Sequence, residues 1–209
     1  MPEKAQSWRP RIAFASFQFS DYRILWFGTL GTAHGFWIQN VVLGWLVLQL
    51  SDSPFIVGIA SALRFFPFIL GPVAGGIADR LDRRRVLQTL VAILVILSLV
   101  AALLVTTGAI NVPLTIALGM GFGTVQAFLF AVRHPYIYDI VGSTRAMNGI
   151  ALNNLAFWGM GIPGSVFGGG LIAWLGADGA FYAMGAGYFF ALVLFFSLRL
   201  NTASATKTK

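Results

Sequence analysis

The feature that most constrains this chain is a series of six long apolar stretches separated by short polar connections. An α-helix needs roughly 20 apolar residues to cross the hydrocarbon core of a bilayer, because it rises about 1.5 Å per residue. The sequence therefore predicts an all-α integral membrane protein with six transmembrane helices. The six stretches are residues 24–50, 54–78, 86–106, 112–132, 147–175 and 179–198.

Composition excludes several other classes of protein. Only 10% of the 209 residues are charged, whereas an ordinary soluble domain is about 25% charged, so a water-facing globular surface cannot be built. Residues 86–106 lack the polar and apolar alternation that membrane β-strands show in segments of about 10 residues. With no cysteine and only His34 and His134, which lie in different segments, the sequence predicts neither a metal site nor a cofactor.

The positions of the basic residues predict the orientation in the membrane. Thirteen of the 14 Lys and Arg residues lie in connections on one side, and the three connections on the other side hold none. The positive-inside rule assigns the basic side to the cytoplasm, so we expect a multi-pass protein of the plasma (cell inner) membrane with both termini cytoplasmic. The net charge of +7 then requires no nucleic-acid partner. The basic segments are residues 1–23, 79–85, 133–146 and 199–209.

The same pattern divides the chain into three parts. Residues 1–23 form a cytoplasmic leader with no cleavable signal peptide, which either lies along the membrane surface or is only partly ordered. Residues 24–198 form the six-helix transmembrane domain. Residues 199–209 form a cytoplasmic tail or the start of an interdomain linker.

Two similar glycine-rich hexapeptides indicate an internal repeat. Residues 71–76 read GPVAGG and residues 164–169 read GSVFGG, in the second helix of each consecutive triplet of spans. The two helices are expected to run in opposite directions across the membrane. We therefore predict two inverted three-helix repeats, an arrangement typical of transporters.

The cytoplasmic connection after the second span carries the most specific motif. It reads GGIADRLDRRRVL over residues 75–87, with the carboxylate of Asp79 among four arginines. A carboxylate placed there can pair with a guanidinium, and the arginines hold the turn on the cytoplasmic side.

This turn resembles a motif of the major facilitator superfamily, Gly-x-Leu-Ala-Asp-Arg-x-Gly-Arg-Arg. Asp82 stands where that motif has glycine, and the resulting form is similar to a branch of exporters that includes the enterobactin exporter. Residues 19–28, 50–58 and 63–76 resemble the same branch. The matching positions of the motif are Gly75, Ile77, Ala78, Asp79, Arg80, Arg83 and Arg84.

The resemblance implies a fold and a mechanism. Members of that superfamily have 12 or more spans in two six-helix halves, with the substrate held between them. This chain then corresponds to one half of a major facilitator fold, the N-terminal one. Its partner is the missing C-terminal half or a second six-helix subunit. The resemblance also assigns Gly75, Asp79, Arg80, Arg83 and Arg84 to a cytoplasmic gating loop between the two halves.

Four polar residues inside the spans are candidates for the lining of a substrate cavity. Arg64 and His34 each lie ten residues into a span, about 15 Å deep in a hydrocarbon core roughly 30 Å thick. Arg64 binds an anionic substrate, pairs with a carboxylate of the other half, or caps backbone carbonyls near Pro67. His34 either packs by hydrogen bonding or carries a proton. Gln126 and Asn153 either line the cavity or join neighbouring helices.

The acidic residues lie in the connections and near the ends of the spans. None of the seven lies well inside a span, although proton-coupled transport usually uses a titratable group within the membrane. If transport is proton-driven, we expect the coupling carboxylate in the other half.

The function that these observations favour is secondary active transport, with efflux of a small lipophilic or siderophore-like molecule by alternating access. An enzyme is not expected, because the spans lack a Gly-x-Ser-Gly surround or paired aspartates for intramembrane hydrolysis, and the chain has no ATP-binding loop. A channel is not expected, because no rings of acidic side chains are evident. The alternative is a non-transporting six-helix bundle or a functionless fragment.

Overall fold

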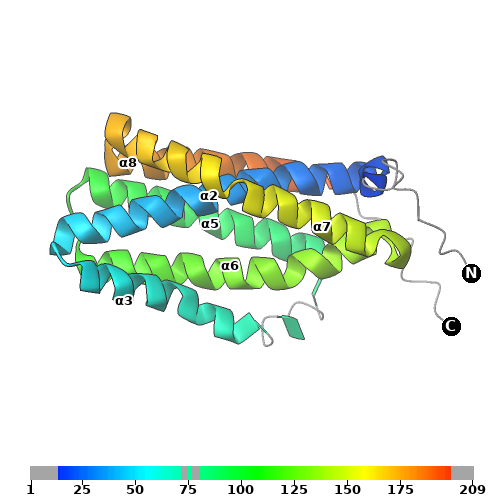
Figure 1. Cartoon of the computed structure of the whole chain (residues 1–209), viewed down its shortest axis with the longest axis horizontal. Coiled ribbons are helices and arrows are strands. Elements are labelled where there is room, and N and C mark those ends of the chain that lie inside the picture. The colour runs from blue at the N-terminus through cyan, green and yellow to red at the C-terminus, as the bar shows by residue number, and fades with distance from the viewer. Residues whose placement is uncertain (1–13, 72–74, 77–80, 199–209) are drawn as a thin grey trace, which may run out of the picture.

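The computed structural model of the chain describes residues 14–71, 75–76 and 81–198, and within these ranges every regular element is helical (Figure 1). The all-α prediction is thus confirmed for this part of the chain. The elements are η1 (Ala15–Gln18), α2 (Ser20–Ser51), α3 (Pro54–Phe65), η2 (Phe66–Leu70), α5 (Arg83–Thr106), α6 (Val112–Val141), α7 (Ser143–Gly159) and α8 (Gly161–Phe196).

Backbone turns with positive φ lie at the three connections that carry no basic residue. Asp52 after α2 has φ 49°, Gly108 after α5 has φ 69°, and Gly176 has φ 75°. A positive φ interrupts right-handed helical geometry, so each of these residues ends one helix and helps to reverse the chain. Glycine adopts such angles without the steric cost that a Cβ atom brings. Asn111 then begins α6, because its side chain accepts a hydrogen bond from the backbone N–H of Leu114 at 3.0 Å.

Gly176 lies within the range of α8, which therefore consists of two helices joined at a bend. Figure 1 shows this as a hairpin coloured from yellow to orange. The predicted fifth span corresponds to α7 and the first part of α8, and the predicted sixth span to the second part. Between Gly159 and Gly161 the helix is also interrupted.

The connection between the fourth and fifth predicted spans is much shorter than the sequence indicated. Helix α6 continues to Val141, and Gly142, with φ 74°, is the one residue before α7 begins at Ser143. The placement of Arg133 in a cytoplasmic loop is therefore wrong, since it lies inside α6 and is 1% exposed.

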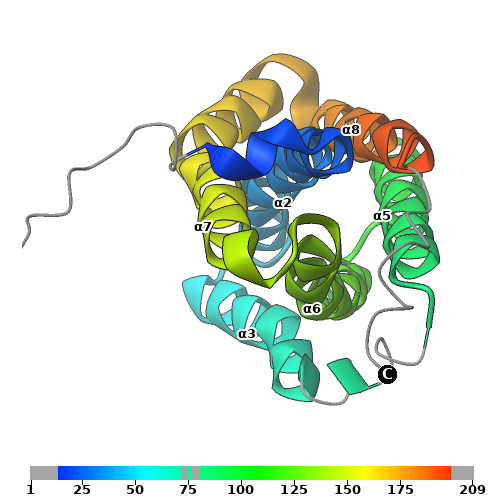
Figure 2. The ribbon, with the colours of Figure 1, turned by 90° about the vertical axis from the view of Figure 1, so that its right-hand side faces the viewer.

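Helix α2 occupies the centre of the bundle, among α6, α7 and α8 (Figure 2). Small residues let α8 approach it closely. A Cβ atom at Gly31 would lie 3.0 Å from the carbonyl oxygen of Gly187, and one at Gly35 would lie 2.5 Å from the ring of Tyr188. Glycine at such contacts allows helix backbones to pack together in a membrane.

Hydrogen bonds from aromatic side chains hold α2 against α7. Three N–H or O–H groups on α2 donate to backbone carbonyls of α7, and we call this set the α2–α7 ladder. Because donors and acceptors both ascend along the chain, the two helices run parallel. The bonds are Tyr22 Oη to Gly149 O (2.7 Å), Trp26 Nε1 to Leu152 O (3.1 Å) and Trp37 Nε1 to Phe157 O (2.9 Å).

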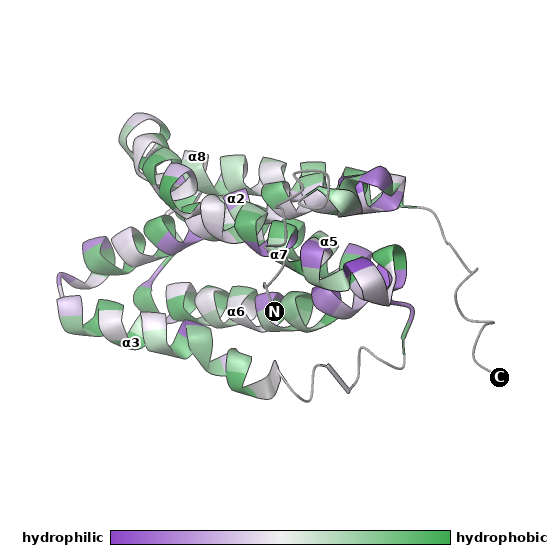
Figure 3. Ribbon diagram, turned by 45° about the vertical axis from the view of Figure 1, so that its right-hand side comes forward, coloured by the Kyte–Doolittle hydropathy of each residue, from purple (hydrophilic) through white to green (hydrophobic). Residues whose placement is uncertain are grey.

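The helices have the length and apolarity that a membrane requires. Three described stretches are long and apolar enough to cross a bilayer: Arg83–Thr106, Val112–Val141 and Ser143–Phe196. Helix α2 is not among them, and it carries His34, Gln39 and Asn40. Figure 3 shows hydrophobic residues along all the helices. Many large apolar side chains are exposed, and Trp174 is 87% exposed. Such a surface suits lipid rather than water. The six-span count and the inverted repeats stay predictions.

The crossing of α3 over α6 depends on one glycine. A Cβ atom at Gly123 would overlap the backbone carbonyl oxygen of Arg64, whereas one at Gly121 would lie 3.7 Å from the methyl groups of Leu97. Gly123→Ala is expected to force α3 away from α6 and to destabilise the protein by about 1–3 kcal/mol. Thermal unfolding in detergent measures the effect, and Gly121→Ala is the matched control. Equal unfolding temperatures for the two variants would contradict the described crossing.

Candidate functional site

The predicted cavity residue Arg64 lies in the last turn of α3 and is 6% exposed. Its Nη1 donates to Asn40 Oδ1 at 2.6 Å, and its guanidinium carbon lies 5.2 Å from the ring centre of Phe36 and 5.4 Å from that of Phe65. Its Nη2 is buried and has no hydrogen-bond partner among the described residues. Since a guanidinium has five N–H donors, Arg64 has spare capacity for an acceptor.

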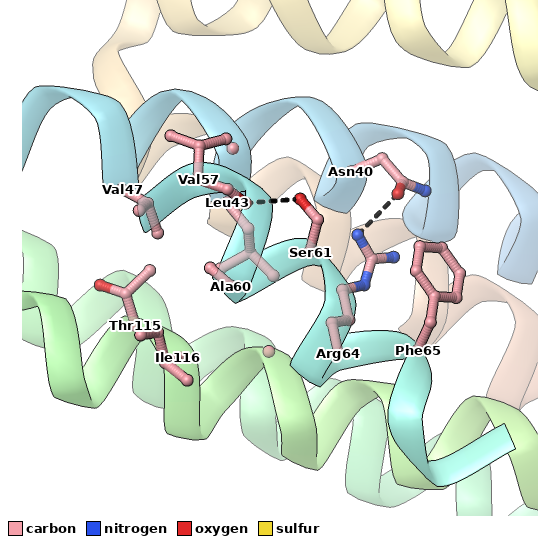
Figure 4. A pocket seen from close by; sticks show the side chains of 12 residues that line it. Asn40, Leu43, Val47, Val57, Ala60, Ser61, Arg64, Phe65, Thr115 and Ile116 are labelled. Atoms are coloured by element: carbon pink, nitrogen blue, oxygen red, sulfur yellow. Dashed lines mark hydrogen bonds between the residues drawn. The ribbon is translucent and has the colours of Figure 1, made fainter. Parts of the chain in front are cut away.

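Arg64 lies on a pocket between α2, α3 and α6 (Figure 4). The pocket has a cavity volume of about 40 Å³, and its other polar side chains are Asn40, Ser61 and Thr115. The hydroxyl of Ser61 donates to Val57 O at 2.8 Å, and the hydroxyl of Thr115 donates to Asn111 O at 2.9 Å. The guanidinium of Arg64 is therefore the polar group of this pocket that is best able to bind a ligand.

Gln126 belongs to a buried polar chain that joins three helices. Its Nε2 donates to Tyr188 Oη at 3.4 Å, and Tyr188 Oη donates to Gln39 Oε1 at 3.2 Å. Gln39 Nε2 and Gln126 Oε1 are buried, and neither has a hydrogen-bond partner within residues 14–71, 75–76 and 81–198. The chain thus places polar groups from α2, α6 and α8 in the centre of the bundle, where unpaired groups are costly.

Asn153 and His34 occupy other contacts. Asn153 Oδ1 accepts a hydrogen bond from Thr29 Oγ1 at 2.8 Å, which adds to the α2–α7 ladder. The ring of His34 is half-buried and lies 5.2 Å from the ring of Phe167 on α8. Within the described residues, no hydrogen bond joins any two of Arg64, His34, Gln126 and Asn153.

Arg133 is a second buried arginine, which the sequence pattern did not predict. Arg133 Nη2 donates to Thr32 Oγ1 at 3.0 Å, while its Nε is buried and has no partner in the part of the chain that the structure describes. Its guanidinium carbon lies 5.8 Å from the ring centre of Phe130 and 5.6 Å from that of Phe157. The predicted fourth span ended at residue 132, but the apolar residues that follow Pro135 at helical spacing were a signal that the helix continues.

An aromatic cluster connects the two buried arginines. Its rings come from α2, α3, η2, α6 and α7, and neighbouring ring centres lie 4.8–6.4 Å apart. Arg64 contacts the cluster at Phe36 and Phe65, and Arg133 contacts it at Phe130 and Phe157. Its members are Phe36, Trp37, Phe65, Phe68, Phe130, Phe157 and Trp158.

Neither buried arginine has an ionic partner in the part of the chain that the structure describes. The ion pairs there join Arg83 Nη1 to Asp139 Oδ2 at 2.6 Å and Arg85 Nε to Asp82 Oδ2 at 3.5 Å. Two positive charges therefore lie inside the bundle with hydroxyl, amide and aromatic neighbours alone.

The described residues of the predicted gating loop include Arg83 and Arg84, which begin α5. Asp79 and Arg80 lie outside the described residues, and a Cβ atom at Gly75 would meet open space. Arg83 pairs with α6 through Asp139, and Arg84 Nη2 donates to Phe196 O at 3.0 Å. The start of α5 is thereby tied to α6 and α8.

Asp82, the departure from the glycine of the motif, is the N-cap of α5. Its Oδ1 accepts hydrogen bonds from the backbone N–H groups of Arg84 at 3.0 Å and Arg85 at 3.4 Å. A carboxylate there satisfies two unpaired N–H groups and complements the helix dipole.

Removal of the amide of Asn40 is expected to lower the free energy of unfolding, because the buried guanidinium of Arg64 depends on it. Asn40→Leu leaves Arg64 Nη1 without its acceptor, so we expect a loss of about 1–3 kcal/mol in stability. Ser61→Ala is the control, because that hydroxyl lines the same pocket but bonds only within α3. Unfolding temperatures in detergent test the difference, and equal values for the two variants would contradict the assigned role of Asn40.

Comparison with known proteins adds to this geometry. The family model described as transmembrane secretion effector (MFS_3) matches residues 11–208. No curated protein matches the chain. An all-helical structure with long apolar helices and a polar interior agrees with that match. The chain belongs to the transmembrane secretion effector family, a family of transporters of the major facilitator type.

Proposed function

We propose that this chain is the N-terminal half of a secondary active transporter that exports a small lipophilic or siderophore-like molecule by alternating access. The observation that carries the proposal is Arg64, a buried cation with a free N–H group on a pocket between three helices. A group of this kind inside a membrane protein usually marks a substrate path or a pairing partner.

Six spans with both termini cytoplasmic are part of this proposal. The turns at Asp52, Gly108 and Gly176 carry no basic residue, whereas Arg83 to Arg85 and Arg145 lie at the opposite ends of their helices. That asymmetry favours a cytoplasmic location for the arginine-rich end. The pocket at Arg64 then opens toward the exterior, and the membrane is the plasma (cell inner) membrane.

A second six-helix unit is expected to complete the site. The pocket is walled by α2, α3 and α6, and alternating access needs an opposing domain against which this bundle can move. We propose that the C-terminal half or a second six-helix subunit supplies that wall. The turn that contains Gly75, Asp79, Arg80, Arg83 and Arg84 acts as the cytoplasmic gate between the two units. Its similarity to the enterobactin exporter branch favours export.

Transport measurements on variants of Arg64 test this function. We expect cells that express the chain together with its second six-helix unit to accumulate less of at least one compound from a panel of aromatic carboxylates, catechols and neutral lipophiles. Arg64→Gln should reduce that efflux about tenfold or more, because it removes a charged hydrogen-bond donor. Arg145→Gln, a change of an exposed arginine beside Phe19, should leave efflux unchanged.

The amount of each variant in the membrane is the control for expression. Unchanged efflux in Arg64→Gln at equal membrane levels would remove Arg64 from the site. No change in accumulation of any compound with the wild-type protein would contradict export.

A further inference from the structure

We propose that Arg133 is a second anion-binding position, and that Arg133 and Arg64 together make the transporter select anionic aromatic molecules over cationic ones. The inference rests on the proposed transport function and narrows its substrate class. It begins from the same observation at both positions, which is a buried guanidinium with an unused donor.

The immediate surroundings of Arg133 do not neutralise it. The side chain is 1% exposed, its one hydrogen-bond partner in the described structure is the hydroxyl of Thr32, and Phe130 and Phe157 flank its guanidinium. A charge removed from water without a counter-charge is strongly destabilising, whereas a hydroxyl and two rings compensate only part of that cost. An anion at the free Nε would supply the missing partner.

The two arginines lie at different depths of the bundle. Gly123 of α6 contacts the backbone of Arg64, and Arg133 lies ten residues further along the same helix, which is about 15 Å. In the orientation proposed above, Arg64 is closer to the exterior and Arg133 closer to the cytoplasm. A substrate that crosses the bundle would therefore meet Arg133 first and Arg64 second.

The structure leaves the two positions unequally accessible. Arg64 lies on an open pocket, whereas the rings of Phe130 and Phe157 enclose Arg133. Alternating access requires this asymmetry, because the site on the closed side must be sealed while the other side is open. We infer that an inward-opening movement withdraws Phe157 on α7 from Phe130 on α6 and uncovers Arg133.

The aromatic cluster between the arginines specifies the rest of the ligand. Its rings offer flat apolar faces and edges, against which an aromatic ring packs in offset or edge-to-face geometry. A ligand with an aromatic body and a carboxylate, phenolate or similar acidic oxygen fits both features. A lipophilic cation would be repelled by two guanidinium groups that no described carboxylate balances.

The test measures equilibrium binding to the protein in lipid nanodiscs with matched probes. The anion is 2-naphthoate and the cation is 2-naphthylmethylammonium, which share one aromatic body and differ in charge. We expect the wild-type protein to bind the anion at least about tenfold more tightly, which corresponds to about 1.4 kcal/mol, because the buried guanidinium groups attract the anion and repel the cation. Arg133→Gln should weaken 2-naphthoate at least about tenfold without weakening the cation.

The ratio of the two affinities separates a binding role from a structural one. If Arg133 has only a structural role, or if a carboxylate of the opposing unit neutralises it, Arg133→Gln would change the affinities for both probes equally or leave both unchanged. Either result overturns the proposal. Arg133→Lys keeps the charge and should keep the preference for the anion. If Arg133→Gln does not fold, a loss of anion preference in a folded Arg133→Lys overturns the proposal.

The matched control is Arg145→Gln, which removes an exposed arginine that also stacks on a ring. It should leave both affinities unchanged. Efflux of neutral compounds by a protein without anion preference would overturn this inference and leave the proposed function intact. Anion preference in a protein that exports no compound would overturn the proposed function instead.

Discussion

The central constraint on this structure is the burial of two guanidinium groups inside an apolar helical bundle. Neither group pairs with a carboxylate among the described residues, so the surrounding helices must stabilise both by other contacts. Arg64 and Arg133 are tolerated because each has one hydrogen bond and two aromatic neighbours. Both keep a buried N–H donor that no described residue accepts from. A membrane protein that retains such groups usually does so for a function, because insertion of an arginine at the bilayer centre costs about 2.5–3.5 kcal/mol.

Helix α2 makes this arrangement possible, because it supplies polar groups in several directions from the centre of the bundle. Asn40 holds Arg64, Thr32 holds Arg133, and Gln39 continues the polar chain toward Tyr188. The α2–α7 ladder fixes α7, whose Phe157 covers Arg133. Trp37 donates to Phe157 O in the last turn of α7, where helical carbonyls lose their own partners. Small movements at that end of α7 would therefore reach both the aromatic cluster and Arg133.

The sequence predicted the features that depend on lipid and on local chain reversal. All-α structure, long apolar helices, turns at residues 51–53, 107–111 and 176–178, and membership of a major facilitator family follow from apolar length, turn residues and the motif. Arg133 was misplaced because the apolar stretch ends at residue 132 and the residues after it carry charge, while α6 stays helical to Val141. The contacts of Gln126, Asn153 and His34 depend on which helices become neighbours, and a single sequence does not contain that information.

The absence of cysteine allows a direct measurement of where the pocket opens and what it binds. Ser61→Cys places one thiol on the pocket beside Arg64, and a membrane-impermeant maleimide reports its accessibility in intact cells. The account predicts labelling from outside, slowed by 2-naphthoate and not by 2-naphthylmethylammonium, with the protection lost in Arg64→Gln. Labelling only after permeabilisation, or equal protection by the two probes, would contradict an outward-opening pocket that selects anions.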